Sequence, residues 1–242
     1  MILKRIVFLI PLLALAWMPG TFATETDRWA EKRAELMVEV SAMMRSLSYT
    51  TLDPAVAAAM NAAPRHEFVT GLAREVAYIN RPLDIGYGQT ISQPFIVALM
   101  TQLLKPQSGD TALEIGTGSG WQAAVLSGLV DEVYTIEIIG DLGETAAARL
   151  TRLDYDNVTP RIGDGYYGWE EHAPFDLIIV TAAASHIPPP LIAQLKPGGR
   201  MIIPVTTGFY VAHLIYVEKH ADGSVHTEQD LPVNFVPLTG DH

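Results

Sequence analysis

Residues 114–120 read Glu114-Ile115-Gly116-Thr117-Gly118-Ser119-Gly120, and this glycine-rich stretch decides how the chain folds. It follows a β-rich run at residues 111–115 and precedes a helical stretch at residues 122–129. Glycines let the backbone turn sharply and approach a ligand without a Cβ in the way, and the following helix offers free N–H groups. The dinucleotide-binding fingerprint would need glycine at position 121, where Trp121 stands. The stretch therefore predicts a tight strand-to-helix turn, either for packing alone or to hold a ligand other than a dinucleotide.

The second half of the chain alternates strand-like and helix-like segments around this turn. Runs rich in β-formers occur at residues 111–115, 132–137, 158–162, 177–181 and 200–204, and helical stretches at residues 122–129, 142–153 and 190–195. This alternation predicts an α/β fold with a mostly parallel, doubly wound sheet that is covered on both faces. Runs at residues 211–219 and 231–237 flank the turn Asp222-Gly223, so we expect an antiparallel C-terminal strand.

The first half of the chain predicts a helical N-terminal extension. Apolar residues at helical spacing indicate an amphipathic helix over residues 27–47, and residues 54–60 indicate a second helix that Asp53 caps. Residues 65–93 are broken by prolines and glycines and read as loop-like, whereas helical periodicity returns after Pro94. We expect a single domain over residues 24–242, made of a helical part with a loop (27–104) and a sheet part (110–242).

Composition excludes several classes of protein. The 242-residue chain is 49% hydrophobic and 18% charged, which allows a sizeable core and excludes wholesale disorder. Its formal net charge of −11 makes it a poor candidate for gripping nucleic acid. The absence of cysteine excludes disulfides and thiolate sites, and no His-Glu-x-x-His or Gly-x-Ser-x-Gly motif occurs. We therefore expect no nucleic-acid partner and no metal, and we expect a monomer.

The first residues resemble a secretory signal peptide. Lys4 and Arg5 precede an apolar run at residues 6–17, and a small-residue site ends at Ala23. The apolar run is too short for a comfortable transmembrane helix. We therefore expect residues 1–23 to be a signal peptide and the protein to be periplasmic or exported. The alternatives are an uncleaved anchor, or a start at Met18 and a cytoplasmic protein.

The spacing of the glycines resembles the cofactor loop of class I S-adenosylmethionine-dependent methyltransferases. That loop reads E-x-G-x-G-x-G, as residues 114–120 do, and it binds a nucleoside that carries an amino acid. Glu137, at the end of the second strand, would accept hydrogen bonds from both ribose hydroxyls, and Asp164, after the third strand, would accept one from the adenine amino group. Each of the two alone is also explained by strand-end or turn chemistry. Together with the loop they lie at the carboxyl ends of successive strands, where open α/β sheets bind ligands.

A second motif narrows the resemblance to one family. Residues 88–94 read Gly88-Gln89-Thr90-Ile91-Ser92-Gln93-Pro94, which is similar to the hallmark of protein-L-isoaspartate O-methyltransferases. Further matching segments follow in the family's order at residues 64–69, 113–120, 163–166, 173–176, 181–184, 194–200 and 235–238. The chain is identified as a member of this family over about residues 35–240. The resemblance implies a Rossmann-like class I methyltransferase fold.

The resemblance also implies a role for each candidate site residue. Ser92 is implied as the active-site residue, although by itself it would also fit an N-cap of the helix that begins at Pro94. S-adenosylmethionine would be bound by Glu114, Gly116, Thr117, Gly118, Ser119, Gly120, Glu137, Asp164 and Gly165. The substrate would be enclosed by Gly88, Gln89, Thr90 and Ile91 on one side and by Val236, Pro237, Leu238 and Thr239 on the other.

The implied reaction is methyl transfer to the free carboxylate of L-isoaspartyl (and D-aspartyl) residues in damaged peptides and proteins, which begins their repair. A carboxylate with a pKa of about 4 is ionised at neutral pH, so the transfer needs no general base and its rate comes from in-line positioning. Damaged proteins would be the partners of such an enzyme. The alternatives are a class I methyltransferase with another small-molecule acceptor, or an exported non-catalytic binding protein of the same fold.

One internal segment departs from the family's pattern. After Val205 the family usually has a glycine and then a glutamine before a leucine, whereas residues 206–210 intervene here and no glutamine precedes Leu214. The departure concerns the edge of the cofactor or substrate site, not the class of reaction.

Overall fold

The computed structural model describes residues 25–47, 49, 51–207 and 211–241. The expected signal peptide (residues 1–23) lies outside the described residues, and so do residues 208–210 of the departing segment. Among the helices of the described part, none combines the length and the apolar character that a membrane span requires.

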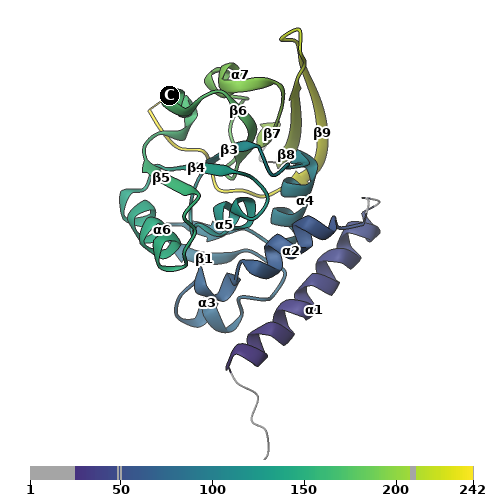
Figure 1. Cartoon of the computed structure of the whole chain (residues 1–242), viewed down its shortest axis with the longest axis vertical. Helices are drawn as coiled ribbons and strands as arrows, with labels where there is room; N and C mark the ends of the chain where they lie inside the picture. Colours follow the sequence, from purple (N-terminus) through teal and green to yellow (C-terminus); the bar gives the residue numbers. More distant parts are fainter. Residues whose placement is uncertain (1–24, 48, 50, 208–210, 242) are drawn as a thin grey trace, which may run out of the picture.

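A seven-stranded sheet forms the centre of the structure, in the order β5-β4-β3-β6-β7-β8-β9 (Figure 1). Its strands are β3 (Thr111–Ile115), β4 (Glu132–Glu137), β5 (Val158–Ile162), β6 (Phe175–Val180), β7 (Leu195–Thr207), β8 (Val211–Lys219) and β9 (Val225–Val233). The pairs from β5 to β7 are parallel, whereas β8 runs antiparallel to both of its neighbours. The α/β fold with a mostly parallel sheet and an antiparallel C-terminal strand is therefore confirmed.

Helices cover both faces of the sheet, as expected of a doubly wound fold. The helices of the sheet part are α4 (Pro94–Leu104), α5 (Trp121–Ser127), α6 (Gly140–Arg152) and α7 (Pro189–Gln194). Neighbouring residues of β3 point to opposite faces, so Ala112 belongs to the core under α4 and α5, and Leu113 to the core under α7. The central parallel strands β3 and β6 are consequently buried on both sides, and the parallel strands end at one shared edge.

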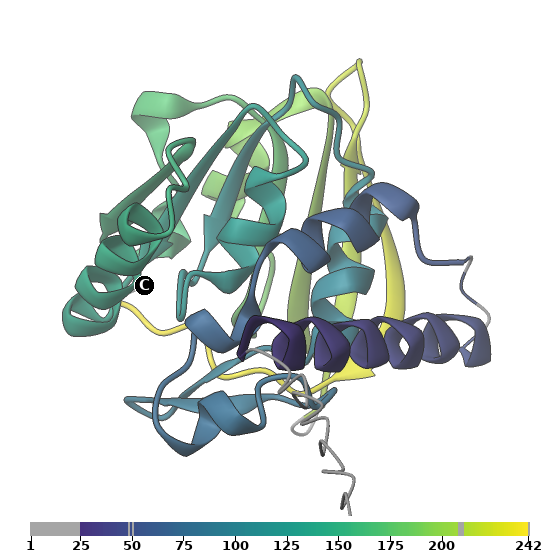
Figure 2. The same ribbon diagram turned by 60° about the horizontal axis from the view of Figure 1, so that its bottom comes forward.

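The N-terminal part adds an outer layer on the α4–α5 face. It contains α1 (Glu25–Ser46), α2 (Pro54–Ala62) and α3 (Leu72–Glu75), and α1 packs across α2 and α4 (Figure 2). Asp53 caps α2 as expected, since its side chain accepts hydrogen bonds from the N–H groups of Ala55 and Val56.

The loop-like interpretation of residues 65–93 is wrong. This segment contains two 3-10 or α-helical turns and an antiparallel hairpin formed by β1 (Leu83–Gly86) and β2 (Gln89–Ile91). Backbone φ angles are positive at Gly86 (+89°), Tyr87 (+56°) and Gly88 (+71°), which turns the chain between the two strands. Strands of three and four residues are too short to show an alternating pattern, so the sequence indicates the turn but not the two strands.

The last strand was also misplaced. It was expected at residues 231–237, but β9 spans Val225–Val233 and pairs Lys219 with Val225 directly after the Asp222-Gly223 turn. β9 is an edge strand, and its exposed polar residues give it no apolar run.

Candidate active site

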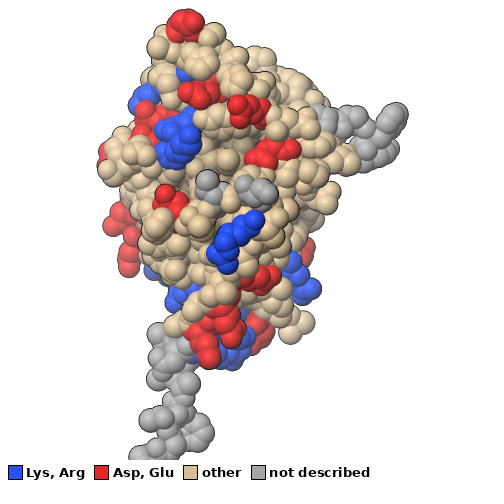
Figure 3. Space-filling model, turned by 90° about the vertical axis from the view of Figure 1, so that its right-hand side faces the viewer, with Lys and Arg blue, Asp and Glu red and all other residues tan. Residues whose placement is uncertain are grey.

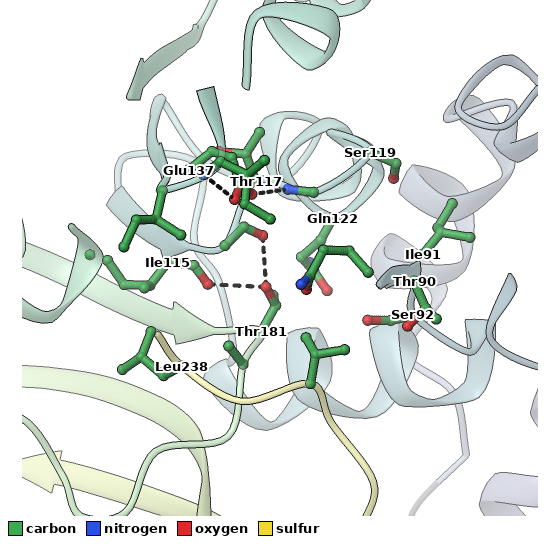
Figure 4. A pocket seen from close by; sticks show the side chains of 18 of the residues that line it. Thr90, Ile91, Ser92, Ile115, Thr117, Ser119, Gln122, Glu137, Thr181 and Leu238 are labelled. Atoms are coloured by element: carbon green, nitrogen blue, oxygen red, sulfur yellow. Dashed lines mark hydrogen bonds between the residues drawn. The ribbon is translucent and has the colours of Figure 1, made fainter. Parts of the chain in front are cut away.

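Two cavities meet at the edge of the sheet where β3, β4 and β6 end. The first is bounded by the glycine-rich turn, the end of β4, the β1–β2 hairpin and residues 236–239 (Figure 4). The second, of about 400 Å³, is bounded by α1, α4 and residues 231–236. The residues that line both cavities are Thr90, Ser92, Thr181 and Val236. A ligand in one cavity would therefore adjoin a ligand in the other at this junction.

The structure gathers most of the residues that the sequence singled out. Those that line the first cavity are Gln89, Thr90, Ile91, Ser92, Gly116, Thr117, Gly118, Ser119, Glu137, Gly165, Val236, Pro237, Leu238 and Thr239. Outside its lining lie Gly88, at the hairpin turn, and Glu114, Gly120 and Asp164.

The glycine-rich turn is packed so closely that one of its glycines has no substitute. Gly116 has a φ of +93°, and a Cβ there would lie 2.4 Å from Oγ1 of Thr181. That hydroxyl donates to the carbonyl oxygens of Ile115 (3.0 Å) and Gly116 (2.7 Å), which ties the ends of β3 and β6 together (Figure 4). Thr181 is thus a site residue that the sequence analysis missed, although its position directly after a strand of the parallel sheet was a usable signal.

Glu137 presents an oriented carboxylate to the first cavity. The side chain is only 5% exposed, and its two oxygens accept hydrogen bonds from the N–H groups of Gly118 (2.8 Å) and Ile139 (3.0 Å). A carboxylate has acceptor sites beyond these two bonds, so Glu137 can still accept from a ligand. The two backbone amides fix the direction in which it does so.

Glu114 supports the glycine-rich turn from beneath. Its side chain is fully buried, and Oε2 accepts a 2.5 Å hydrogen bond from Thr135, whose hydroxyl is also 2.7 Å from that of Thr117. Burial, with a smaller contribution from the charge of Glu137, raises the pKa of Glu114 from 4.5 to about 8. Glu114 is therefore mostly neutral at pH 7, and it reaches the first cavity only through two threonines.

Asp164 and Gly165 follow β5, and of the two only Gly165 lines the first cavity. Oδ1 of Asp164 accepts a hydrogen bond from the N–H of Tyr166 (2.9 Å), so this side chain caps a short 3-10 turn that carries Gly165. Gly165 itself lines the first cavity, and a Cβ there would lie 2.3 Å from Cγ2 of Ile115. Glycine is consequently required here by packing.

Ser92 is not the N-cap of α4. The capping position is Gln93, and no side chain at that position bonds to the helix. Instead Asn80 supplies Oδ1 to the N–H of Phe95 (3.0 Å), and Gln93 donates from Nε2 to the carbonyl oxygen of Asn80 (3.0 Å). The capping group comes from a distant segment, which sequence spacing could not indicate. The Ser92 side chain is half-buried at the junction of the two cavities.

The first cavity fits S-adenosylmethionine in its chemistry. Gly116 and Gly118 place backbone without side chains at the start of α5, and the oriented carboxylate of Glu137 matches a ribose diol. Ile136, Ile138 and Ile139 add an apolar wall beside that carboxylate. Among the residues that the structure describes, none with a cationic side chain lines this cavity.

Comparisons with known proteins agree with this chemistry. The family model described as protein-L-isoaspartate(D-aspartate) O-methyltransferase (PCMT) matches residues 38–242. A relative from Cupriavidus necator, named protein-L-isoaspartate O-methyltransferase 1, is 56% identical over 97% of this chain and 92% of its own length. Another from a Polaromonas species, named protein-L-isoaspartate O-methyltransferase 2, is 60% identical over 85% of this chain and 99% of its own length.

Solved structures give the same result. One named protein-L-isoaspartate O-methyltransferase has a TM-score of 0.77 and 29% identity, covering 86% of this chain and 66% of the other. A second, from Plasmodium falciparum, bears the family's name, is in complex with S-adenosyl-L-homocysteine and has a TM-score of 0.74 and 25% identity, covering 86% of this chain and 98% of the other. The resemblance that the sequence motifs indicated is therefore confirmed: the chain belongs to the protein-L-isoaspartate (D-aspartate) O-methyltransferase family and is an S-adenosylmethionine-dependent methyltransferase.

Proposed function

We propose that this enzyme transfers the methyl group of S-adenosylmethionine to the free carboxylate of L-isoaspartyl (and D-aspartyl) residues in damaged peptides and proteins, at the junction where the two cavities meet. The observation that carries the proposal is that Thr90, Ser92, Thr181 and Val236 line both cavities. Transfer requires a methyl donor and an acceptor in contact, and a shared wall of this kind supports that contact.

The cofactor side of the junction is assigned from the lining of the first cavity. Glu137 would hold the ribose hydroxyls, because its carboxylate is aimed by two backbone amides. Gly116 and Gly118 would let the methionine portion approach the backbone, and Gly165 would leave room for the adenine. Asp164, which caps the turn that carries Gly165, would accept a hydrogen bond from the adenine amino group.

The substrate side is assigned to the second cavity. The described residues that line it are all uncharged, and the apolar ones include Met43, Phe95, Leu231 and Phe235. We infer that this cavity accommodates apolar parts of the peptide next to the damaged residue, because apolar surfaces gain free energy when they leave water together. The acceptor carboxylate would then lie at the junction, beside Ser92.

Methyl transfer to a carboxylate requires the protein mainly to position the acceptor and the methyl donor. The carboxylate oxygen attacks the methyl carbon, a carbon–oxygen bond forms, and the carbon–sulfur bond breaks with its electron pair going to the sulfur. An acceptor with a pKa of about 4 is already ionised at neutral pH, so no base removes a proton. The Ser92 hydroxyl would donate a hydrogen bond to the carboxylate and hold it in line. Intramolecular reactions suggest that such alignment contributes up to roughly 7–11 kcal/mol.

The product explains how methylation begins repair. The methoxy group of a methyl ester leaves far more readily than an oxygen of a carboxylate. The next backbone nitrogen therefore attacks the ester carbonyl and closes a succinimide, and the methoxy group leaves as methanol with the proton of that nitrogen. Hydrolysis of the succinimide returns part of the material to normal aspartate.

A methylation assay tests this proposal. The full chain is incubated with S-adenosylmethionine and with two peptides that differ only in isoaspartate against aspartate, and the products are weighed by mass spectrometry. We expect the ester, or the succinimide it yields, on the isoaspartyl peptide alone. If neither peptide reacts although the cofactor stabilises the protein against heat, the acceptor is another molecule; if the cofactor does not bind, the chain is a non-catalytic binding protein.

We also propose that the protein is a metal-free monomer that does not bind nucleic acid. The described residues contain no cluster of side chains that could hold a metal ion. The net charge is −11, and the face in Figure 3 mixes acidic with basic side chains instead of gathering a basic patch. Light scattering should give one chain mass, and chelators should leave the activity unchanged.

We further propose that residues 1–23 direct export and are removed after Ala23. The support is the order of a basic segment, an apolar run and a small-residue site. Cell fractionation with mass spectrometry of the N-terminus tests this: a protein that begins at residue 24 in the periplasm is expected, and a full-length or Met18-started protein in the cytosol would overturn it.

A further inference from the structure

Arg65 is a buried arginine that joins the two ends of the β1–β2 hairpin. It begins a 3-10 turn (Arg65–Glu67), far along the chain from the hairpin, and its exposed fraction is 0%. Its Nη2 donates to the carbonyl oxygen of Arg81 (3.1 Å) and to that of Ser92 (3.0 Å). These two residues flank the hairpin on either side, so one nitrogen atom ties together the points where the hairpin leaves and rejoins the fold.

The rest of the guanidinium group has unusual surroundings. Among the described residues, Nε and Nη1 are buried without any hydrogen-bond partner. The group lies 4.8 Å from the centre of the Trp121 ring, and burial lowers the pKa of Arg65 to about 9. Burying a cation without a carboxylate partner carries a desolvation cost, which hydrogen bonds to two carbonyl oxygens offset only in part. Stability alone is therefore a poor explanation for an arginine at this position.

The contacts of Arg65 connect the walls of both cavities. Trp121 lines the first cavity and is held by a hydrogen bond from its Nε1 to the carbonyl oxygen of Ala63 (3.1 Å). Ser92 lines both cavities. Arg65 thus spans from the start of α5, beside the cofactor, to the backbone of the residue at the junction.

The opposite end of the hairpin is held far less firmly. Tyr87 at the turn is 58% exposed, and its hydroxyl donates to Oδ2 of Asp141 at 3.2 Å. A hydrogen bond that is exposed to water contributes little to holding the hairpin in place. A buried donor that bonds to two carbonyl oxygens restrains the hairpin more strongly. The position of Ser92 is consequently set at the root of the hairpin and not at its tip.

We propose that Arg65 is a positioning residue that fixes the root of the β1–β2 hairpin and thereby places Ser92 against the acceptor carboxylate. This inference rests on the function proposed above. Arg65 lines neither cavity, so it acts through the backbone of Ser92 and touches neither substrate nor cofactor. Its loss should impair turnover more than cofactor binding.

The test compares Arg65→Met with a matched control in the full chain. Arg161→Met is the control, because that guanidinium also lies over a tryptophan (4.6 Å from the Trp169 ring centre) but lines neither cavity. Arg65→Met should lower kcat with the isoaspartyl peptide about 10- to 100-fold, the effect of a small misplacement at a reacting centre. S-adenosylhomocysteine should bind within about twofold of wild type. The reason is that Trp121, the residue of the first cavity on which Arg65 stacks, keeps its own hydrogen bond to Ala63. Amide hydrogen exchange of residues 83–92 should become faster.

Two further variants separate positioning from a general structural effect. When Arg65→Met is added to Ser92→Ala, kcat should fall by less than about threefold relative to Ser92→Ala alone. Both changes act on the same hydroxyl, so their effects on kcat do not add. Arg65→Lys keeps a cation but not the planar fork, so it should recover only part of kcat, and it replaces Arg65→Met if that variant does not fold.

Three results would overturn the proposal. They are an unchanged kcat in Arg65→Met, a loss of kcat that is equally large with and without the Ser92 hydroxyl, and unchanged hydrogen exchange at residues 83–92. The exchange measurement needs no substrate. A wild-type protein that fails to methylate the isoaspartyl peptide would therefore defeat the proposed function, while the exchange data would still decide whether Arg65 holds the hairpin.

Discussion

Two elements around the first cavity contain glycine-rich turns, and these two turns are held in opposite ways. In the turn at residues 114–120, the N–H of Gly116 donates to Ile136 (2.8 Å) and the missing side chain leaves room for Thr181. In the β1–β2 hairpin, a Cβ at Gly86 or Gly88 would meet nothing within 4 Å. The first turn is part of the packed sheet, whereas the second is the exposed turn of a short two-stranded ribbon outside that sheet. We therefore expect cofactor binding to depend on how closely the turn at residues 114–120 is packed. We expect the position of the substrate to depend on a few polar contacts of the hairpin.

The largest expected effect on stability comes from comparing one added methyl group at Gly116 with one added at Gly88. Gly116→Ala should lower the free energy of unfolding by roughly 2–4 kcal/mol, because the Cβ overlaps Thr181 and the φ of +93° is strained for alanine. Gly88→Ala, with the same strain but open space, should cost about 1 kcal/mol. Chemical denaturation measures both values, and calorimetry should show that only Gly116→Ala loses cofactor affinity. Equal losses in the two variants would remove the contrast between the turns.

Ser92→Ala should give the next largest effect, on turnover only. Loss of one hydrogen bond to a charged group corresponds to about 1.5–3 kcal/mol, which is roughly a 10- to 100-fold lower kcat with the isoaspartyl peptide. S-adenosylhomocysteine affinity should stay nearly unchanged, as measured by calorimetry. Ser127→Ala is the matched control, since its hydroxyl bonds to Ala124 away from both cavities. Lost cofactor affinity in Ser92→Ala would contradict a role limited to the acceptor.

Glu114→Gln should reduce the pH dependence of the free energy of unfolding. Burial raises the pKa of Glu114 in the folded state to about 8, above its ordinary value of 4.5, so the folded chain holds the proton more tightly. This contribution to stability is complete below about pH 4.5 and disappears as the pH rises through 8, with a slope of up to about 1.4 kcal/mol per pH unit.

The measurement is the free energy of unfolding at several pH values between 5 and 8. Wild type should lose stability as the pH rises, whereas Glu114→Gln, which stays neutral, should lose less. Glu144→Gln on the exposed face of α6 serves as the control and should keep the wild-type slope. Parallel curves for wild type and Glu114→Gln would contradict a neutral Glu114.

Tyr87→Phe should give the smallest effect. It removes the exposed hydrogen bond between the hairpin turn and Asp141, so the dissociation rate of S-adenosylhomocysteine should rise by about twofold, while kcat stays within error of wild type. Stopped-flow fluorescence measures the dissociation rate, and Tyr167→Phe provides a control at a tyrosine outside both cavities. A tenfold faster dissociation would mean that the tip, and not the root, holds the hairpin.

The sheet was predictable because its signals are local. The strands expected at residues 111–115, 132–137, 158–162 and 211–219 have these bounds in the structure. Each of these segments is a short run rich in β-forming residues, and turn residues or helical stretches separate it from the next run. The carboxyl ends of such strands lie at one edge by topology, so Glu137 could be assigned to a site before any contact was known.

The hairpin was not predictable because its support is distant in the sequence. Arg65 bonds to carbonyls 16 and 27 residues away, and Asn80 caps a helix whose first-turn N–H is 15 residues further on. Neither contact follows a fixed spacing, unlike a local cap or a strand-to-helix turn. For the same reason the cap assigned to Ser92 was wrong, while its place beside the cofactor motif was foreseen only through the family resemblance.

The sequence by itself determined the class of fold, the cofactor loop and the family, because short-range patterns of glycines, apolar runs and motifs encode them. Only the tertiary structure decided that Glu114 lies beneath the loop, that Thr181 closes it, and that two cavities share the wall at Ser92. These features depend on which side chains meet across the folded chain, and burial changes the chemistry of a group such as Glu114 only after they have met.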